Sequence, residues 1–213
     1  VSGSPPQCYP RSRSPSERFE CCCQHPGCLP RRRWKFPEGE PFLDPLITNL
    51  GSLDGELRAA SAYALARLAS ASRLAALRGR YTGRRCFVIG NGPSLANTDL
   101  SLLRNEITFG ANRLYLLFER LGFPTTFYTA VDPLLVQHYY QDLDRLETTK
   151  FLPARHRRLF TFDRSTLFLE EAPPLTFARR PSAGVWDGGS VTYVNLQLAC
   201  FMACDPVYLV GLD

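Results

Sequence analysis

Apolar residues follow two alternating patterns along this 213-residue chain. Short continuous apolar runs are typical of strands buried on both faces, and they occupy 85–89, 107–111, 126–131, 159–162 and 207–212. Segments with helical spacing lie between them, at 100–104, 114–121, 133–147 and 190–203. Strands that alternate with helices predict an α/β fold, with a Rossmann-like, mostly parallel sheet and helices on both faces.

A long Ala- and Leu-rich segment precedes the first of these strands. Between 56 and 77, small and apolar residues recur at helical spacing, at Leu57, Ala60, Ala64, Leu68, Ala71 and Ala75. Arginines occupy other positions around the turn. The pattern predicts an amphipathic helix that packs on the domain that follows.

The first 41 residues have a different composition from the rest. They contain eight of the 17 prolines, with scattered Ser and Arg and no hydrophobic periodicity. Such a segment buries too little apolar surface to offset the entropy lost on ordering. We therefore expect a disordered Pro/Arg/Cys-rich leader over 1–41, a helical segment over 42–79, and an α/β domain over 80–213.

Cysteine is concentrated in this leader, in the stretch "CCCQHPGC" at 21–28 and at Cys8. Thiolates and the imidazole of His25 are zinc ligands, but three adjacent cysteines do not face one ion, and no second Cys/His pair follows. The sequence favours a leader without metal. Cys200 and Cys204, at i and i+4 of the last predicted helix, are interpreted as small core residues.

Net charge and hydropathy restrict the class of protein. A formal net charge of +5 suits anionic ligands but falls short of a nucleic-acid-binding surface. No apolar run is long enough to span a bilayer, and the first residues do not resemble a signal peptide. We expect a cytoplasmic protein without nucleic-acid partners. Because the chain stops directly after a strand, we also expect a fragment; its oligomeric state is not predicted.

The stretch "CFVIGNGPSL" at 86–95 raises the first question of chemistry. An apolar strand ends at Gly90, Asn91 and Gly92, and Ser94 follows as a helix cap. In open α/β sheets, ligands sit beyond the carboxyl ends of the strands, where glycines allow close approach of a phosphate. Taken alone, the stretch favours a plain strand-to-helix turn without a ligand, because it lacks the full G-x-G-x-x-G pattern.

Three further polar segments at strand ends favour a ligand. "GANR" places Asn112 and Arg113 after the second strand, and "VDP" places Asp132 after the third. "DGGSVT" at 187–192 places Gly189 and Ser190 at the start of the last helix. Carboxyl ends of parallel strands lie on one edge of a sheet, so these residues are expected to form one crevice. His138 lies on a helix and is interpreted as a surface or packing residue.

These blocks together resemble a known family. "GRRCFVIGNGPSLANTDLSLLRNEITFGANRLYLLF", "TTFYTAVDP" and "GGSVTYVNLQLACFMACDPVYLVGLD" are similar to the 6-hydroxymethylpterin diphosphokinase MptE-like domain family. That family is related to bacterial sialyltransferases that share the G-N-G-P-S-L loop. The resemblance covers about 80–213. It implies a Rossmann-like fold with a nucleotide bound at the strand ends.

The resemblance also implies roles for individual residues. Gly90, Asn91, Gly92 and Ser94 would hold the nucleotide phosphates. Asn112 would contact the nucleotide, and Gly189 with Ser190 would flank its base or ribose. The sialyltransferase branch tends to carry Asn where this chain has Asp132, and a carboxylate suits Mg²⁺ better. Arg113 would compensate the phosphate charge, so Asp132 and Arg113 are the expected catalytic residues.

Three functions follow from this resemblance and stay open. The first is a nucleotide-dependent transferase that moves a diphosphate from ATP to a hydroxymethyl group, which requires Mg²⁺. The second is a metal-free nucleotide-sugar glycosyltransferase of the sialyltransferase type, in which a catalytic His is expected beyond the final strand. The third is a nucleotide-binding module without catalysis. In each, the partners are a nucleotide and, for the transferases, a small acceptor.

Overall fold

The computed structural model describes residue 51 and residues 55–161 and 163–213. The expected leader and its cysteine cluster lie outside the described residues. Contacts divide the chain into two units, Val1–Leu65 and Ala66–Asp213, and the whole sheet belongs to the second. No helix among the described residues is both long enough and apolar enough to cross a membrane.

The second unit is built on six parallel strands in the order β5-β4-β3-β2-β1-β6. The strands are β1 (Cys86–Ile89), β2 (Ile107–Ala111), β3 (Phe127–Thr129), β4 (Thr149–Pro153), β5 (Thr166–Leu169) and β6 (Val207–Val210). The chain crosses the sheet in one direction from β1 to β5 and then returns to the far side of β1. The strand order therefore reverses between β1 and β6, which is where ligands bind in sheets of this type.

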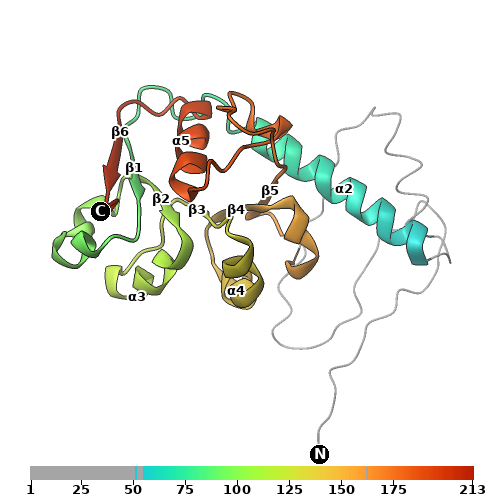
Figure 1. Ribbon diagram of the computed structural model, residues 1–213, viewed down its shortest axis with the longest axis horizontal. Coiled ribbons are helices and arrows are strands. Elements are labelled where there is room, and N and C mark those ends of the chain that lie inside the picture. Colours follow the sequence, from blue (N-terminus) through green and yellow to red (C-terminus); the bar gives the residue numbers. More distant parts are fainter. Residues whose placement is uncertain (1–50, 52–54, 162) are drawn as a thin grey trace, which may run out of the picture. The chain divides into compact units, whose positions relative to one another are not determined.

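Helices connect the strands and cover both faces of the sheet (Figure 1). The α-helices are α2 (Gly55–Ala75), α3 (Phe118–Leu121), α4 (Pro133–Arg145) and α5 (Val191–Phe201). Short 3₁₀ helices are η1 (Pro93–Asn97), η2 (Leu100–Leu103), η3 (Asn112–Leu117), η4 (Ala154–Leu159) and η5 (Pro181–Ala183). Helix α5 covers one face, and α3 and α4 cover the other. The predicted Rossmann-like α/β fold is confirmed.

Alternate residues of each inner strand enter cores on opposite faces. On the α5 side, Val88 and Phe127 pack with Val194 and Leu198. On the other side, Tyr128 packs with Val136 of α4. Because both faces are covered, β1, β2 and β3 consist mostly of apolar residues, which is why the sequence pattern shows them.

Two strands were not predicted correctly. The segment 159–162 was expected to be a strand, but η4 ends there at Leu159 and β5 begins only at Thr166. Strand β4 was missed because a lysine, Lys150, interrupts its apolar run. Strand β6 is present, but Tyr208 and Leu209 are about half exposed, at 46% and 51%, because β6 is an edge strand rather than one buried on both sides.

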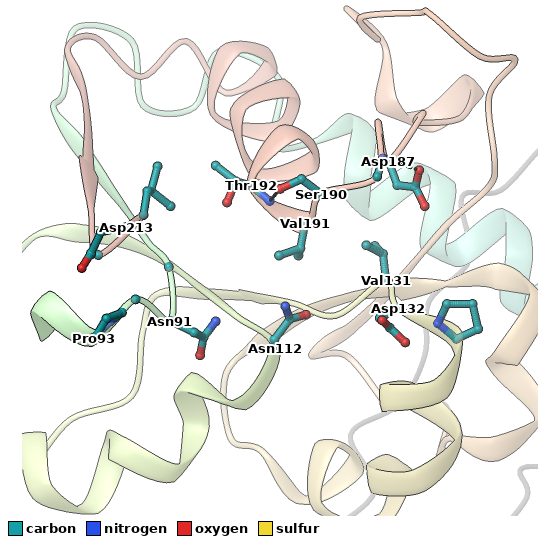
Figure 2. Close-up of a pocket in the computed structure, with 16 residues that line it drawn as sticks. Asn91, Pro93, Asn112, Val131, Asp132, Asp187, Ser190, Val191, Thr192 and Asp213 are labelled. Carbon is teal, nitrogen blue, oxygen red and sulfur yellow. Dashed lines mark hydrogen bonds between the residues drawn. The ribbon is translucent and has the colours of Figure 1, made fainter.

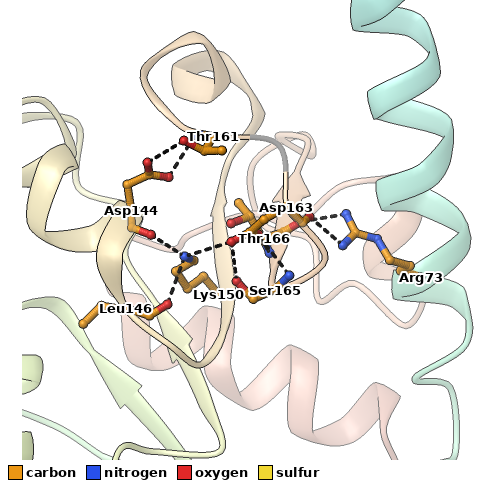
Figure 3. Close-up of polar contacts among 8 residues, drawn as sticks. All are labelled: Arg73, Asp144, Leu146, Lys150, Thr161, Asp163, Ser165 and Thr166. Carbon is orange, nitrogen blue, oxygen red and sulfur yellow. Dashed lines mark hydrogen bonds and ion pairs between the residues drawn. The ribbon is translucent and has the colours of Figure 1, made fainter. Parts of the chain in front are cut away.

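Lys150 is fully buried, and its environment explains how a strand accommodates it (Figure 3). Its Nζ donates to the backbone oxygens of Asp144 and Leu146, at 2.9 and 3.1 Å, and lies 3.7 Å from Oδ2 of Asp163. Asp144 and Leu146 are at the carboxyl end of α4, where carbonyls lack partners within the helix. The ammonium group therefore caps α4 from the neighbouring strand.

The end of α2 that belongs to the second unit docks beside this cluster. Arg73 donates to the backbone oxygens of Asp163 and Thr166, at 2.9 and 2.8 Å. Leu74 is buried in the core on the α5 side of the sheet. As predicted, this helix packs on the α/β domain, although the contacts described here involve only its last turns.

Candidate functional site

A pocket of about 550 Å³ opens at the carboxyl edge of the sheet (Figure 2). Its walls come from the segments after β1, β2, β3 and β6 and from the start of α5. The lining residues are Gly90, Asn91, Gly92, Pro93, Asn112, Val131, Asp132, Pro133, Asp187, Gly189, Ser190, Val191, Thr192, Gly211, Leu212 and Asp213. The volume is in the range of sites that hold nucleotide-sized ligands. All four strand-end segments singled out in the sequence contribute to this pocket.

The first glycine turn lies directly against the segment that follows β6. Gly90 N donates to Val210 O at 2.8 Å, and Gly92 N donates to Gly211 O at 2.9 Å. A Cβ on Gly90 would collide with Gly211 O, and one on Gly92 would lie 2.6 Å from Asp213 O. Close backbone packing is therefore one reason for glycine at both positions, besides any approach of a phosphate.

Ser94 lies beside the pocket rather than among its lining residues, and it is paired with Asp213. The Asp213 carboxylate accepts hydrogen bonds from Ser94 N, at 3.1 Å, and from the Ser94 hydroxyl. These bonds, above all the one from the hydroxyl, hold the pKa of Asp213 below its usual range. A carboxylate thus occupies the donors that the sequence assigns to a phosphate.

Two asparagines form the floor of the pocket between the two glycine turns. The Asn91 amide donates to Ala111 O at 3.0 Å, which ties the end of β1 to the end of β2. Asn112 has a left-handed backbone with φ of 51°, and its carbonyl accepts from the hydroxyl of Tyr128. Its side-chain Oδ1 is buried and has no partner among the described residues. Such a strained residue with an unpaired polar atom is typical of binding sites.

Asp132 stands at the end of the pocket nearest α4 and caps that helix. Its Oδ1 accepts from Leu134 N and Leu135 N, at 2.8 and 3.0 Å, and Pro133 occupies the first helical position. Oδ2 accepts no hydrogen bond from the described residues and the side chain is exposed. One carboxylate oxygen is therefore available to a ligand or a metal ion.

The second glycine turn forms the wall opposite the asparagines. Gly188 and Gly189 have φ of 60° and 73°, which glycine adopts readily. Asp187 Oδ1 accepts from Gly189 N at 3.1 Å, and Ser190 caps α5 by accepting from Thr192 N at 3.2 Å. The amino end of an 11-residue helix therefore faces the pocket, as Figure 2 shows.

The charged residues in the described lining of the pocket are all acidic. Among the residues that the structure describes, its lining contains three carboxylates, Asp132, Asp187 and Asp213, and no Lys, Arg or His. No group of three or more His, Cys, Asp or Glu side chains in the described part of the chain could enclose a metal ion. Mg²⁺, however, is commonly held by one or two carboxylates together with substrate phosphates and water, and the free oxygen of Asp132 fits that mode.

Sequence reasoning missed several lining residues. Asp187 precedes the second glycine turn, and its role in fixing Gly189 was not visible from the pattern. Gly211, Leu212 and Asp213 follow the last strand and obey the same rule as the other strand ends. That rule would have identified them had it been applied to the end of β6.

Four other residues discussed from the sequence lie outside the lining. Arg113 is exposed, and its guanidinium carbon lies 4.9 Å from the ring centre of Tyr139. His138 is exposed on α4, with Nδ1 2.8 Å from Leu134 O, in line with a surface role. Cys204 is buried, but Cys200 is exposed, so the interpretation of Cys200 as a core residue was wrong.

Comparisons with known proteins give one match. No model of a protein family matches the chain, and neither does any curated protein. The structure is similar to the MAf glycosyltransferase from Magnetospirillum magneticum AMB-1, with 14% sequence identity and a TM-score of 0.45. The match covers 69% of this chain and 27% of that one, and we draw nothing about substrate or reaction from it. The resemblance to the MptE-like domain family stays a prediction from the sequence.

Proposed function

We propose that this chain binds a magnesium-bound nucleoside triphosphate in the pocket and transfers a diphosphate from it to a hydroxyl group of a small acceptor. The observation that carries the proposal is the convergence of both glycine turns, Asn112 and Asp132 on one pocket where the strand order reverses. This is the arrangement expected of a nucleotide site in a parallel α/β sheet.

The nucleotide is proposed to lie across the pocket between its two walls. The start of α5 would bind phosphate and ribose groups. The turn at Gly90–Ser94 would bind phosphate through Ser94 once Asp213 is displaced, because the amides of its two glycines already donate to backbone oxygens at the end of β6 and just after it. The unpaired Oδ1 of Asn112 would accept a hydrogen bond from the ligand, which explains why the structure tolerates a buried polar atom without a partner.

The charge of the lining supports a metal-dependent reaction. Phosphates placed beside three carboxylates would be repelled unless a cation lay between them. Mg²⁺, when bound, supplies that charge and aligns the phosphates, with Oδ2 of Asp132 as its protein ligand. A metal-free glycosyltransferase would place a nucleotide phosphate in the same acidic pocket without such compensation.

The reaction itself is a substitution at phosphorus. The acceptor oxygen would bond to the β-phosphorus, the bond between that phosphorus and the α,β-bridging oxygen would break, and AMP would leave. The hydroxyl proton goes to solvent or to a carboxylate, and Asp187 stands on the wall facing Asp132. In such reactions the protein contributes mainly by positioning the two substrates.

The substitution Asp132→Asn tests this proposal. Asparagine caps helices about as well as aspartate, so the melting temperature should change by no more than about 2 °C. It is a poorer magnesium ligand, so magnesium-dependent affinity for ATP should fall about tenfold or more, as measured by calorimetric titration with and without the metal.

Asp99→Asn is the matched control, because Asp99 caps η2 through Ser101 N and does not line the pocket. It should leave nucleotide affinity unchanged. Nucleotide binding that is indifferent to both a chelator and Asp132→Asn would contradict the magnesium-dependent reaction and favour the metal-free glycosyltransferase. No binding of ATP, CTP, GTP or CMP-sugars by the wild-type chain would contradict a nucleotide site altogether.

A further inference from the structure

The described part of the pocket lining contains no basic residue, but Arg155 contacts one of its walls from outside. Arg155 is the second residue of η4, just beyond the carboxyl end of β4. Its Nη2 donates to the backbone oxygen of Val131 at 3.3 Å, and Val131 lines the pocket next to Asp132. The guanidinium is thus attached to the pocket wall at the end where Asp132 stands.

The other half of the guanidinium is paired with Glu171. The backbone of Glu171 also forms an isolated parallel β-bridge with Val185. Val185 lies two residues before Asp187, which belongs to the pocket wall formed by the second glycine turn. Arg155 therefore lies between two chain segments that lead into the pocket. The ion pair is open to water, with side-chain exposures of 40% for Arg155 and 66% for Glu171. Exposed pairs of this kind contribute little, so a ligand can replace Glu171 at small cost.

The spacing of the sheet decides which part of a nucleotide Arg155 can meet. Adjacent strands are about 4.8 Å apart, so the end of β3 lies about 10 Å from the end of β1. A single phosphate bound at the turn after β1 does not extend to Val131 and Arg155. A triphosphate chain covers most of that distance, and its terminal group would arrive between Asp132 and Arg155.

We propose that Arg155 is a binding residue for the terminal phosphate of a nucleoside triphosphate, and that it exchanges Glu171 for this phosphate when the ligand enters. A guanidinium binds phosphate oxygens with two parallel hydrogen bonds, which makes it suited to this role. The inference rests on the proposed nucleotide site. It adds that the site selects triphosphates over monophosphates, which a CMP-sugar enzyme would not do.

The test is a calorimetric comparison of ATP with AMP, in magnesium, on the wild-type chain and on Arg155→Met. We expect Arg155→Met to weaken ATP binding about tenfold or more and to leave AMP binding within about twofold of wild type, because the lost hydrogen bonds are charge-assisted. Arg158→Met is the matched control: it removes an exposed arginine from the same 3₁₀ helix and should change neither affinity.

Glu171→Gln gives an independent readout of opposite sign. Because it removes the carboxylate that competes for Arg155, it should strengthen ATP binding severalfold, and it decides the matter even if Arg155→Met does not fold. Unchanged ATP affinity in both variants, or equal losses for ATP and AMP in Arg155→Met, would overturn this role of Arg155 while leaving the nucleotide site intact. If the wild-type chain binds neither ATP nor AMP, the nucleotide site and this inference fail together.

Discussion

Asp213 competes directly with the phosphate that is proposed to bind at the first glycine turn. Its carboxylate accepts from the backbone and the hydroxyl of Ser94, which are donors that a phosphate would use. A phosphate that binds at this turn must displace or repel the carboxylate. The side chain is therefore expected to lower nucleotide affinity rather than raise it.

The substitution Asp213→Asn measures this competition. Asparagine keeps a hydrogen-bond acceptor for Ser94 but removes the negative charge, so nucleotide affinity in calorimetric titration should rise about threefold to tenfold. Asp187→Asn is the comparison. It removes a negative charge from the same pocket, but the Asp187 carboxylate accepts from Gly189 N and does not occupy the donors of the first glycine turn. Weaker binding in Asp213→Asn would mean that the carboxylate itself holds the ligand.

Asn195 on α5 offers a second test at the scale of a residue. It is fully buried, and neither its Oδ1 nor its Nδ2 has a partner among the described residues. Replacement of an unpaired buried amide by an apolar group of the same shape is neutral or stabilising. Asn195→Leu should therefore leave the free energy of unfolding unchanged or raise it by about 1 kcal/mol, as measured by urea denaturation.

Gln197, two residues further along α5, is the matched contrast. It is equally buried, but its amide accepts from Ala178 N and donates to Trp186 O, at 2.9 and 2.8 Å. Gln197→Met leaves both of these groups without a partner and should cost about 1–3 kcal/mol. If Asn195→Leu is as destabilising as Gln197→Met, the Asn195 amide has a partner such as buried water.

At the scale of elements, Lys150 joins β4 to the end of α4. Removal of its ammonium group leaves the backbone oxygens of Asp144 and Leu146 unsatisfied and removes the cation beside Asp163. We expect Lys150→Met to lower the free energy of unfolding by about 2–3 kcal/mol in urea denaturation. Some of the loss is offset because the buried charge no longer has to be desolvated.

Arg145→Met is the control for this prediction. Arg145 is also a cation in the last turn of α4, but it is exposed, so its loss should cost less than about 0.5 kcal/mol. Equal effects of the two substitutions would show that charge near the helix end matters rather than the buried cap. A stabilising Lys150→Met would show that desolvation outweighs the two hydrogen bonds.

At the scale of the whole molecule, the pocket joins segments that are far apart in the sequence. A ligand there contacts the turn after β1, the start of α5 and the segment after β6 at once. Magnesium and ATP at 100 times the dissociation constant should stabilise the fold by about 2.7 kcal/mol. Hydrogen exchange should slow in 90–95, 187–192 and 211–213 but not in 163–166, which lies outside the lining. Protection confined to 163–166 would place the ligand elsewhere.

Local sequence rules account for much of this fold. The apolar runs of β1, β2 and β3 reflect burial, and Pro133 with Asp132 marks the start of α4. The glycine turns and polar residues after these strands predicted one crevice, because parallel strands end on the same edge. These features depend on neighbours in the chain, so the residue order determines them by itself.

Other features depend on contacts between distant segments, and only the tertiary structure decided them. Lys150 interrupts an apolar pattern, and its partners at the end of α4 become visible only once β4 packs beside that helix. The pairing of Ser94 with Asp213 requires β6 to lie next to β1, although 119 positions separate the two residues. Arg155 reaches Val131 for the same reason. The order of the strands in the sheet determines which of these segments lie next to one another. No local pattern in the sequence encodes that order.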